Sequence, residues 1–331
     1  MRLTLRFDMR QPDQEADRAE LYQAMLDICE WADGLGFDEV FIGEHHAADD
    51  GYIPQPVVLA SGVGARTRRM KIHLSALLVT MYHPLHLAEQ LAIADLVSNG
   101  RLRITAGMGY RPHEFEMFGV DPKKKVRIFL DTLEVLKQAW TGEPFEFAGR
   151  TVRVTPKPAQ PGGPQIIMGG SAEAAARRAA KLGYDFLPGH PDLYEIYKAE
   201  LKRLGKPEPP PLPTQKPYFL HVTDDPERDW PIVGPHVLYT VNSYAQWATE
   251  RQSGTTQYAQ QQDIGELRKQ DLYQVLTPDD CVEYAKSIGN DAELHFQPLY
   301  GGLDPEIGWK SLKLFEEAVL PRLREEGLRP R

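Results

Sequence analysis

Short apolar runs alternate along the chain with longer stretches in which apolar residues recur every three or four positions. The short runs predict buried β-strands, and the longer stretches predict amphipathic helices. Because strands and helices alternate, a parallel sheet covered by helices is the expected architecture. The predicted strands span residues 3–7, 39–42, 72–79, 102–106, 165–168, 184–187, 218–222 and 293–296.

Eight such units in 331 residues predict a single α/β domain, residues 1–331, folded as a (β/α)8 TIM barrel. The alternative is a doubly wound sheet. That fold usually has a glycine-rich turn after its first strand, and Phe7-Asp8-Met9-Arg10 is not such a turn. The sequence therefore favours the barrel.

Two segments do not fit the regular alternation. Residues 144–156 contain two short alternating runs joined by Gly149, which predict a hairpin insertion. Residues 224–275 are polar and weakly periodic, and we expect a long insertion between strands seven and eight, over the active-site face. Its aromatic residues either line an apolar pocket, or fold over the site as a lid, or anchor the insertion to the barrel wall; they are Trp230, Tyr239, Tyr244, Trp247 and Tyr258.

Composition and charge narrow the class of protein. The formal net charge is −9, which disfavours nucleic acid because phosphate binding needs a basic surface. No apolar run reaches the roughly 18 residues of a membrane span, and residues 2–7 do not begin a signal peptide. Cys29 and Cys281 are expected as free, buried thiols. We therefore expect a cytoplasmic protein with no membrane or nucleic-acid partner.

Ionisable residues follow the second predicted strand, in the run Gly43-Glu44-His45-His46. The carboxyl ends of barrel strands carry the active site, so Glu44 and His45 are candidates for proton transfer. The alternative is that one histidine packs in the core and the other faces water. Neighbouring strand residues point to opposite faces, which makes these two histidines a poor chelating pair, and no metal site is expected.

Two glycine-containing turns follow other strands. Gly169-Gly170-Ser171 could hold an anion if Ser171 caps the following helix, although Glu173 in the first turn would repel a phosphate. After the fourth strand, Gly107-Met108-Gly109-Tyr110-Arg111-Pro112 is not a dinucleotide fingerprint, because Pro112 replaces the third glycine and no helix is expected there. The glycines of this turn would instead let the backbone lie close to a flat ring. Arg111 would then either reach a phosphate or extend into solvent.

Several segments in this order resemble the bacterial luciferase-like flavin-dependent monooxygenases: residues 36–46, 82–89, 99–103, 115–119, and 313–315 with 319–321. The resemblance implies a flavin across the barrel mouth, with its ring near strands three and four and its phosphate near strand five. It implies that His45 is the catalytic acid or base, and that the Ser75-Ala76 peptide bond is cis beneath the ring. Glu89 matches a position near a subunit interface, so a homodimer is expected.

The chain departs from the luciferases at the cofactor. Gly107 stands where they carry a reactive cysteine, and Met108 stands where they carry an arginine near the phosphate. Arg111, Arg177 or Arg178 could replace that arginine. Gly169, Gly170 and Ser171 replace a serine-rich phosphate loop, so light emission is not expected.

The leading expectation is a monooxygenase that oxidises a small apolar organic substrate with O2 and with reduced FMN from a separate flavin reductase. The first alternative is hydride transfer with a deazaflavin coenzyme. The second is a non-catalytic flavin-binding or partner subunit, which the retention of Glu44, His45, His46 and residues 224–275 disfavours. The expected cofactor contacts are Ser75, Ala76, Gly107, Met108, Arg111, Gly169, Gly170 and Ser171.

Overall fold

The computed structural model describes residues 1–13, 17–212, 216–250 and 259–329. Seven parallel strands form one curled sheet in the order β11–β1–β2–β3–β4–β7–β8. All seven coincide with predicted strands, so the parallel α/β class is confirmed. Their bounds are β1 Arg2–Phe7, β2 Glu39–Ile42, β3 Lys71–Leu78, β4 Leu102–Gly107, β7 Gln165–Gly170, β8 Asp185–Pro188 and β11 Glu293–Phe296.

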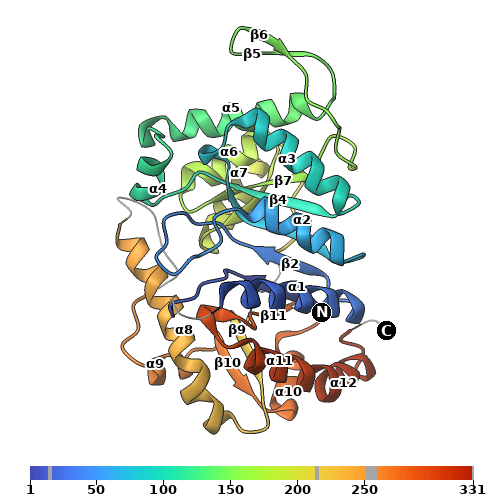
Figure 1. The fold of residues 1–331 in the computed structure, drawn as a ribbon, viewed down its shortest axis with the longest axis vertical. Coiled ribbons are helices and arrows are strands. Elements are labelled where there is room, and N and C mark those ends of the chain that lie inside the picture. The colour runs from blue at the N-terminus through green and yellow to red at the C-terminus, as the bar shows by residue number, and fades with distance from the viewer. Residues whose placement is uncertain (14–16, 213–215, 251–258, 330–331) are drawn as a thin grey trace.

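Helices connect these strands and cover the outside of the sheet (Figure 1). Several begin with a proline, whose missing N–H is not needed in the first turn. Thr277 caps α10 by accepting from the amide of Asp280 at 3.2 Å, as its sequence predicted. The helices are α1 Arg18–Leu35, α2 Pro56–Arg66, α3 Pro84–Val97, α4 Pro112–Met117, α5 Lys125–Ala139, α6 Glu173–Leu182, α7 Asp192–Arg203, α8 Pro226–Thr249, α9 Ile264–Arg268, α10 Pro278–Ile288, α11 Pro305–Leu314 and α12 Leu320–Glu325.

Strand β9 (Phe219–Val222) is not part of the seven-stranded sheet. It pairs in parallel with β10 (Tyr273–Leu276), with Phe219 opposite Tyr273 and Val222 opposite Leu276. The side chain of Gln297, just after β11, donates to the carbonyl of Tyr218, so this pair lies beside β11. The sequence did not predict β10, because it lies at the end of the segment interpreted as an insertion. The closed eight-stranded barrel stays a prediction.

Helix α8 fills much of the segment predicted as a weakly periodic insertion. Asp225 caps it by accepting from the amide of Arg228 at 3.1 Å. Pro231 and Pro235 lie inside the helix. Because proline usually interrupts a helix, the sequence did not predict one here. The apolar face of α8 packs in a second core together with β9, β10 and the loop after β11; this face carries Trp230, Val233, Val237 and Val241.

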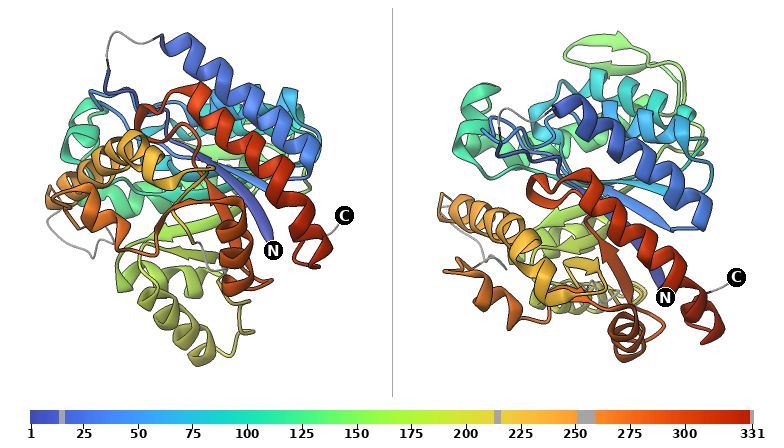
Figure 2. Two further views of the ribbon diagram at one scale, coloured as in Figure 1. Left: turned by 90° about the horizontal axis from the view of Figure 1, so that it is seen from below. Right: turned by 60° about the horizontal axis from the view of Figure 1, so that its bottom comes forward.

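The remaining elements agree with the sequence. Strands β5 (Phe145–Phe147) and β6 (Arg150–Val152) form the predicted hairpin, which projects from the upper end of the molecule in Figure 1. Cys29 and Cys281 are free and buried. The N-terminus lies beside the described residues that follow α12 (Figure 2), because the terminal amine of Met1 donates to the carbonyl of Leu328 at 2.9 Å. Over its described part, the chain contains no helix that is both long and apolar enough to span a bilayer.

Candidate active site

His45 follows strand β2 and is buried beside Glu114 of helix α4. Its Nδ1 atom lies 2.7 Å from Glu114 Oε1, and the amide of His46 donates to the same oxygen at 3.1 Å. The prediction of no helix at Pro112 was wrong, and Glu114 was not among the predicted site residues. A proline at the start of a helix followed by an acidic residue in the first turn is a helix signal that could have identified it.

The pairing with Glu114 sets the proton position on His45. Burial lowers the pKa of His45, although the hydrogen bond and charge of Glu114 oppose this shift. Burial alone would raise the pKa of the Glu114 carboxyl, but the hydrogen bond and charge of His45 hold it below its usual value. Because an ionised carboxylate only accepts hydrogen bonds, the imidazole proton lies on Nδ1. The Nε2 atom therefore has a lone pair that can accept a proton, and the Tyr110 hydroxyl lies 3.4 Å from it.

Glu44 is buried in a different environment from His45. Its Oε1 atom lies 2.8 Å from His46 Nε2 and accepts from the Tyr82 hydroxyl at 2.7 Å, while Oε2 accepts from the amide of Leu78 at 2.6 Å. Burial raises the pKa of the Glu44 carboxyl, although the hydrogen bonds from His46, Leu78 and Tyr82 oppose the shift. These contacts tie the end of β2 to the end of β3, and they indicate that Glu44 positions the loop that carries His45.

Aromatic rings surround the imidazole of His45. Ring centroids lie 4.9 Å away for Tyr52, 5.4 Å for Tyr110, 6.3 Å for Tyr244 and 4.7 Å for Trp247. Tyr244 and Trp247 come from α8, so the segment predicted as an insertion contacts His45. Trp230 packs in the second core, which agrees with the anchoring interpretation, and that Tyr244 and Trp247 line a pocket stays a prediction. Tyr258 lies outside the described residues.

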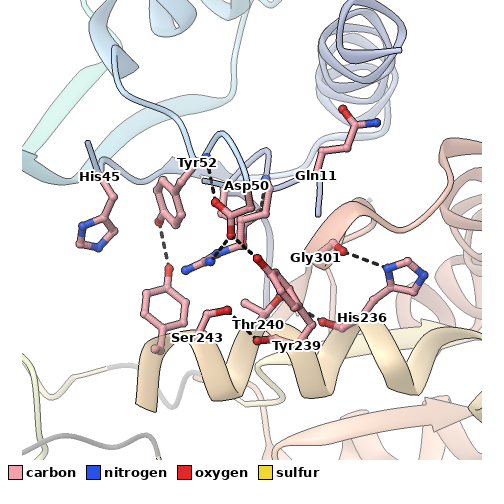
Figure 3. Close-up of polar contacts among 12 residues, drawn as sticks. Gln11, His45, Asp50, Tyr52, His236, Tyr239, Thr240, Ser243 and Gly301 are labelled. Atoms are coloured by element: carbon pink, nitrogen blue, oxygen red, sulfur yellow. Dashed lines mark hydrogen bonds and ion pairs between the residues drawn. The ribbon is translucent and has the colours of Figure 1, made fainter. Parts of the chain in front are cut away.

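Arg10 lies at the centre of this aromatic group and is fully buried. Its Nη1 atom forms an ion pair with Asp50, which also accepts from the Tyr239 hydroxyl of α8 at 2.9 Å. Figure 3 shows Tyr239 reaching from α8 to Asp50, and Tyr52 pointing toward the same helix, where its hydroxyl lies 3.0 Å from that of Tyr244. Arg10 was not among the predicted site residues, because a single arginine after a strand does not form a recognisable sequence motif.

The structure brings together three of the predicted cofactor residues on β3 and β4. The Ser75-Ala76 peptide bond is cis, as the resemblance implied. Ala76 interrupts the regular pairing of β3 with β4, since Ser75 pairs with Thr105 and Leu77 with Ala106. A Cβ atom on Gly107 would lie 3.1 Å from the Ala76 methyl. Only glycine therefore keeps the two backbones this close without a shift of the neighbouring residues.

Gly169, Gly170 and Ser171 lie at the carboxyl end of β7. The prediction that Ser171 caps the next helix was wrong: α6 begins at Glu173, Ala172 is its N-cap residue, and no side chain caps it. Glu173 is largely exposed, and Arg177 Nη2 donates to its carboxylate at 3.3 Å, which offsets its charge. The first amides of α6 and the Ser171 hydroxyl thus form a donor set that suits a phosphate.

Met108 and Arg111 lie apart from this donor set. The carbonyl of Met108 accepts from the Thr80 hydroxyl at 2.9 Å. Arg111 is buried rather than solvated, and its Nη1 atom donates to the carbonyl of His46 at 2.8 Å. Arg111 therefore lies beside His45, not at the end of β7.

The predicted residues form a row along one edge of the sheet. His45 follows β2, Ser75 and Ala76 lie on β3, Gly107 ends β4, and Gly169 to Ser171 end β7; these four strands are neighbours in that order. With neighbouring strands about 4.8 Å apart, the row spans roughly 15 Å. Comparison with known sequences agrees with this arrangement, because residues 3–295 match the family model for luciferase-like monooxygenases.

The chain belongs to the luciferase-like monooxygenase family. This is a family of oxidoreductases. A curated family relative, the oxygenase component of the flavin-dependent trigonelline monooxygenase of Acinetobacter baylyi, is 27% identical over 145 residues, which cover 43% of this chain and 40% of that protein. Matches to three curated relatives span only 32% to 40% of their length.

Solved structures of similar fold include one in complex with FMN and one of a coenzyme F420 dependent enzyme. The oxygenating constituent of 3,6-diketocamphane monooxygenase from Pseudomonas putida, in complex with FMN, has a TM-score of 0.71 and 18% identity, over 97% of this chain and 99% of the other. The coenzyme F420 dependent tetrahydromethanopterin reductase from Methanopyrus kandleri has a TM-score of 0.62 and 18% identity, over 97% and 99%. At these identities the likeness concerns the fold alone.

Proposed function

We propose that this luciferase-like protein is the oxygenase component of a two-component monooxygenase, which uses reduced FMN and O2 to oxidise a small apolar organic substrate. The observation that carries the proposal is the buried His45–Glu114 pair at the same edge of the sheet as the Ser75-Ala76 and Gly107 contact. The family match and the FMN complex of a similar fold support it.

The residue types at this edge of the sheet, and the order of the strands that carry them, fit FMN. Ala76 and Gly107 offer a flat backbone surface for the ring, because neither carries a large side chain there. The uncapped start of α6 and the Ser171 hydroxyl suit the phosphate. When bound, reduced FMN would supply the electrons for dioxygen activation.

The protein's own residues would control proton transfer and water access. Glu114 holds the His45 proton on Nδ1 and leaves Nε2 to accept or return a proton. The rings of Tyr52, Tyr110, Tyr244 and Trp247 surround the imidazole and would limit the access of water to it. Glu44 keeps the supporting loop in place through Leu78 and Tyr82.

Hydride transfer with a deazaflavin coenzyme is the second candidate, and the similar fold of the coenzyme F420 dependent reductase supports it. Titration of the purified protein with FMN and with coenzyme F420, each oxidised and reduced, separates the two candidates. We expect micromolar binding of reduced FMN and no saturable binding of coenzyme F420. The opposite preference would refute the monooxygenase proposal.

The reductase requirement can be tested with the same protein. With NADH, FMN and a flavin reductase, we expect oxygen uptake coupled to a product that carries an atom from 18O2. Candidate substrates are a long-chain aldehyde, a terpenoid and an aromatic compound. Flavin bound without any labelled product across this panel would favour the non-catalytic alternative.

We also propose a homodimer formed through α2 and α3. These helices pack against each other, and between them they expose four apolar side chains, Val58, Ile93, Leu96 and Val97. Glu89 lies one turn before Ile93 on α3.

Two further points belong to the proposal. The free thiols of Cys29 and Cys281 fit a cytoplasmic location. We also propose that the strands close into an eight-stranded barrel, with residues 224–275 over its mouth.

A further inference from the structure

The indole of Trp247 occupies a defined place beside His45. Both the Arg10 and the Arg111 guanidinium carbons lie 4.2 Å from its ring centroid. The His45 ring centroid lies 4.7 Å from the same indole. A planar ring in this place is therefore stabilised by two cations and lies next to the group that can move a proton.

The two arginines also keep buried donor atoms without a hydrogen-bond partner among the described residues. These atoms are Nη2 and Nε of Arg10 and Nε of Arg111; each Nε faces a carboxylate oxygen in a longer ion pair, Asp8 at 3.5 Å and Glu250 at 3.7 Å, whereas Arg10 Nη2 has no such neighbour among the described residues. Arg10 is fully buried and Arg111 is only 5% exposed, so water cannot freely satisfy these donors. An indole has no acceptor atom to offer them. A ligand with a planar ring and an acceptor oxygen would fit the same place better than Trp247 does.

The local charge shows which kind of oxygen fits. The two guanidiniums already face four carboxyl groups: Asp8 and Asp50 pair with Arg10, Glu250 lies 3.7 Å from Arg111 Nε, and Glu114 lies 4.0 Å from Arg111 Nη1. A negatively charged substituent would add a fifth acidic group to a site with two cations. A neutral carbonyl oxygen accepts the same hydrogen bonds without that repulsion.

We propose that Arg10 and Arg111 form the substrate site for a planar aromatic or conjugated ketone or aldehyde, which would take the place of the Trp247 indole between the two guanidiniums. The inference rests on the proposed function, since it assigns the substrate class of that monooxygenase. Binding of such a compound requires Trp247 to leave its place, so the affinity observed for the wild type includes the cost of displacing the indole.

Four probes test this assignment in the wild-type protein by calorimetry, without flavin and without turnover. They are 2-acetylnaphthalene, naphthalene, 2-decalone and 2-naphthoate. We expect 2-acetylnaphthalene to bind about tenfold more tightly than naphthalene, which lacks the oxygen, and about tenfold more tightly than 2-decalone, which lacks the planar ring. Equal affinities within this set, or tighter binding of 2-naphthoate, would overturn the assignment.

Trp247→Ala tests whether the indole holds the ligand's place. It should tighten 2-acetylnaphthalene binding about tenfold, because no indole has to be displaced. Trp230→Ala is the matched control: it lies on the same helix, about 25 Å away along its axis, and Arg268 lies 5.6 Å from its ring centroid. That variant should bind the probe like the wild type. Unchanged or weaker binding in Trp247→Ala would refute the displacement.

Arg10→Lys tests the donor atoms. It should weaken 2-acetylnaphthalene binding about tenfold and leave naphthalene binding within twofold, because lysine keeps the charge but loses the planar donor group. If this variant does not fold, the wild-type probe series still decides the point. An equal loss for both probes would contradict the assignment.

A repeat with FMN-saturated protein separates this inference from the proposed function. We expect 2-acetylnaphthalene to bind equally well with FMN present. Displacement of the probe by FMN would assign the place to the flavin ring and overturn the inference. Probe binding by a protein that fails to bind FMN would leave the substrate site standing and refute the monooxygenase proposal instead.

Discussion

The Nδ1 atom of His45 lies 2.7 Å from the Oε1 atom of Glu114, 69 positions away along the chain. Both side chains are buried, and Glu114 Oε1 also accepts from the amide of His46. One carboxylate oxygen therefore fixes the imidazole tautomer and the backbone that carries it. This pair is the element of the site on which the proton chemistry depends.

Glu114→Gln should lower the pKa of His45 further below its ordinary value. The reason is that Glu114 now raises this pKa against the larger effect of burial, by its hydrogen bond and its charge. An NMR titration of the labelled His45 ring measures the shift, and kcat for substrate oxidation should fall about 10- to 100-fold. Glu116→Gln is the matched control, since Glu116 lies on the same short helix and is mostly exposed; a similar shift there would contradict a specific role for Glu114.

His45→Ala should abolish most turnover while FMN still binds. The ring surface at Ala76 and Gly107 and the donors at Ser171 lie on other strands, so removal of the imidazole leaves them in place. We expect substrate oxidation to fall roughly 10²- to 10⁴-fold and the FMN dissociation constant to change less than threefold. Steady-state oxygen uptake and FMN titration measure the two effects, and unchanged turnover would rule out the acid–base role.

Glu44→Ala should destabilise the fold. It would leave the Leu78 amide, the Tyr82 hydroxyl and His46 Nε2 buried without their acceptor. We expect the free energy of unfolding in urea to fall by about 2–4 kcal/mol. Glu30→Ala, which removes an exposed partner of Arg66, should cost less than about 1 kcal/mol. Full stability combined with lost turnover would instead indicate that Glu44 acts directly in the reaction.

Acid should destabilise the protein through His295, whose Nδ1 atom lies 2.8 Å from the Thr4 hydroxyl inside the sheet. Burial and the charge of Arg6 lower its pKa to about 3. The unfolded chain, with a histidine pKa near 6.5, binds more protons than the folded chain between these values. The stability contribution is therefore complete above about pH 6.5 and is lost as the pH falls toward 3.

His295→Asn keeps a polar group near Thr4 but cannot titrate. Urea unfolding at pH 7, 5 and 4 should show a smaller loss of stability on acidification for this variant than for the wild type, by about 1–3 kcal/mol at pH 4. His113→Asn changes an exposed histidine and should retain the wild-type pH dependence. Parallel pH profiles for all three proteins would contradict the assignment.

Ile93→Glu should convert the proposed homodimer to a monomer. The substitution places a charge among the exposed apolar side chains of α2 and α3, where burial against a second copy would cost several kcal/mol. Size-exclusion chromatography with light scattering measures the molecular mass. Leu182→Glu on α6 is the control, because Leu182 is also about half exposed but lies on a different helix; a wild-type protein that runs as a monomer would refute the dimer.

The sequence predicted the parts of the fold that depend on local pattern. The seven strands of the main sheet, the β5–β6 hairpin and the Thr277 cap follow from apolar period, turn residues and capping chemistry over a few positions. Helix α8 was missed because Pro231 and Pro235 interrupt the local signal, while its stability comes from packing against β9 and β10. Strand β10 was missed because it lies at the end of the segment that was interpreted as an insertion, and its partner strand β9 is distant in the sequence.

For the site, the sequence by itself determined that His45, Gly107 and Ser171 lie at or just after the carboxyl ends of strands and that Ser75 lies within a strand. Only the tertiary structure decided the partners of His45, since Glu114 and Trp247 reach it from α4 and α8. Arg10 is buried in the tertiary structure, and Arg111 lies beside His45 and not beside the Ser171 hydroxyl and the first amides of α6. The physical reason is that period and capping act over a few residues, whereas hydrogen bonds, desolvation and ring contacts form wherever the folded chain brings distant side chains together.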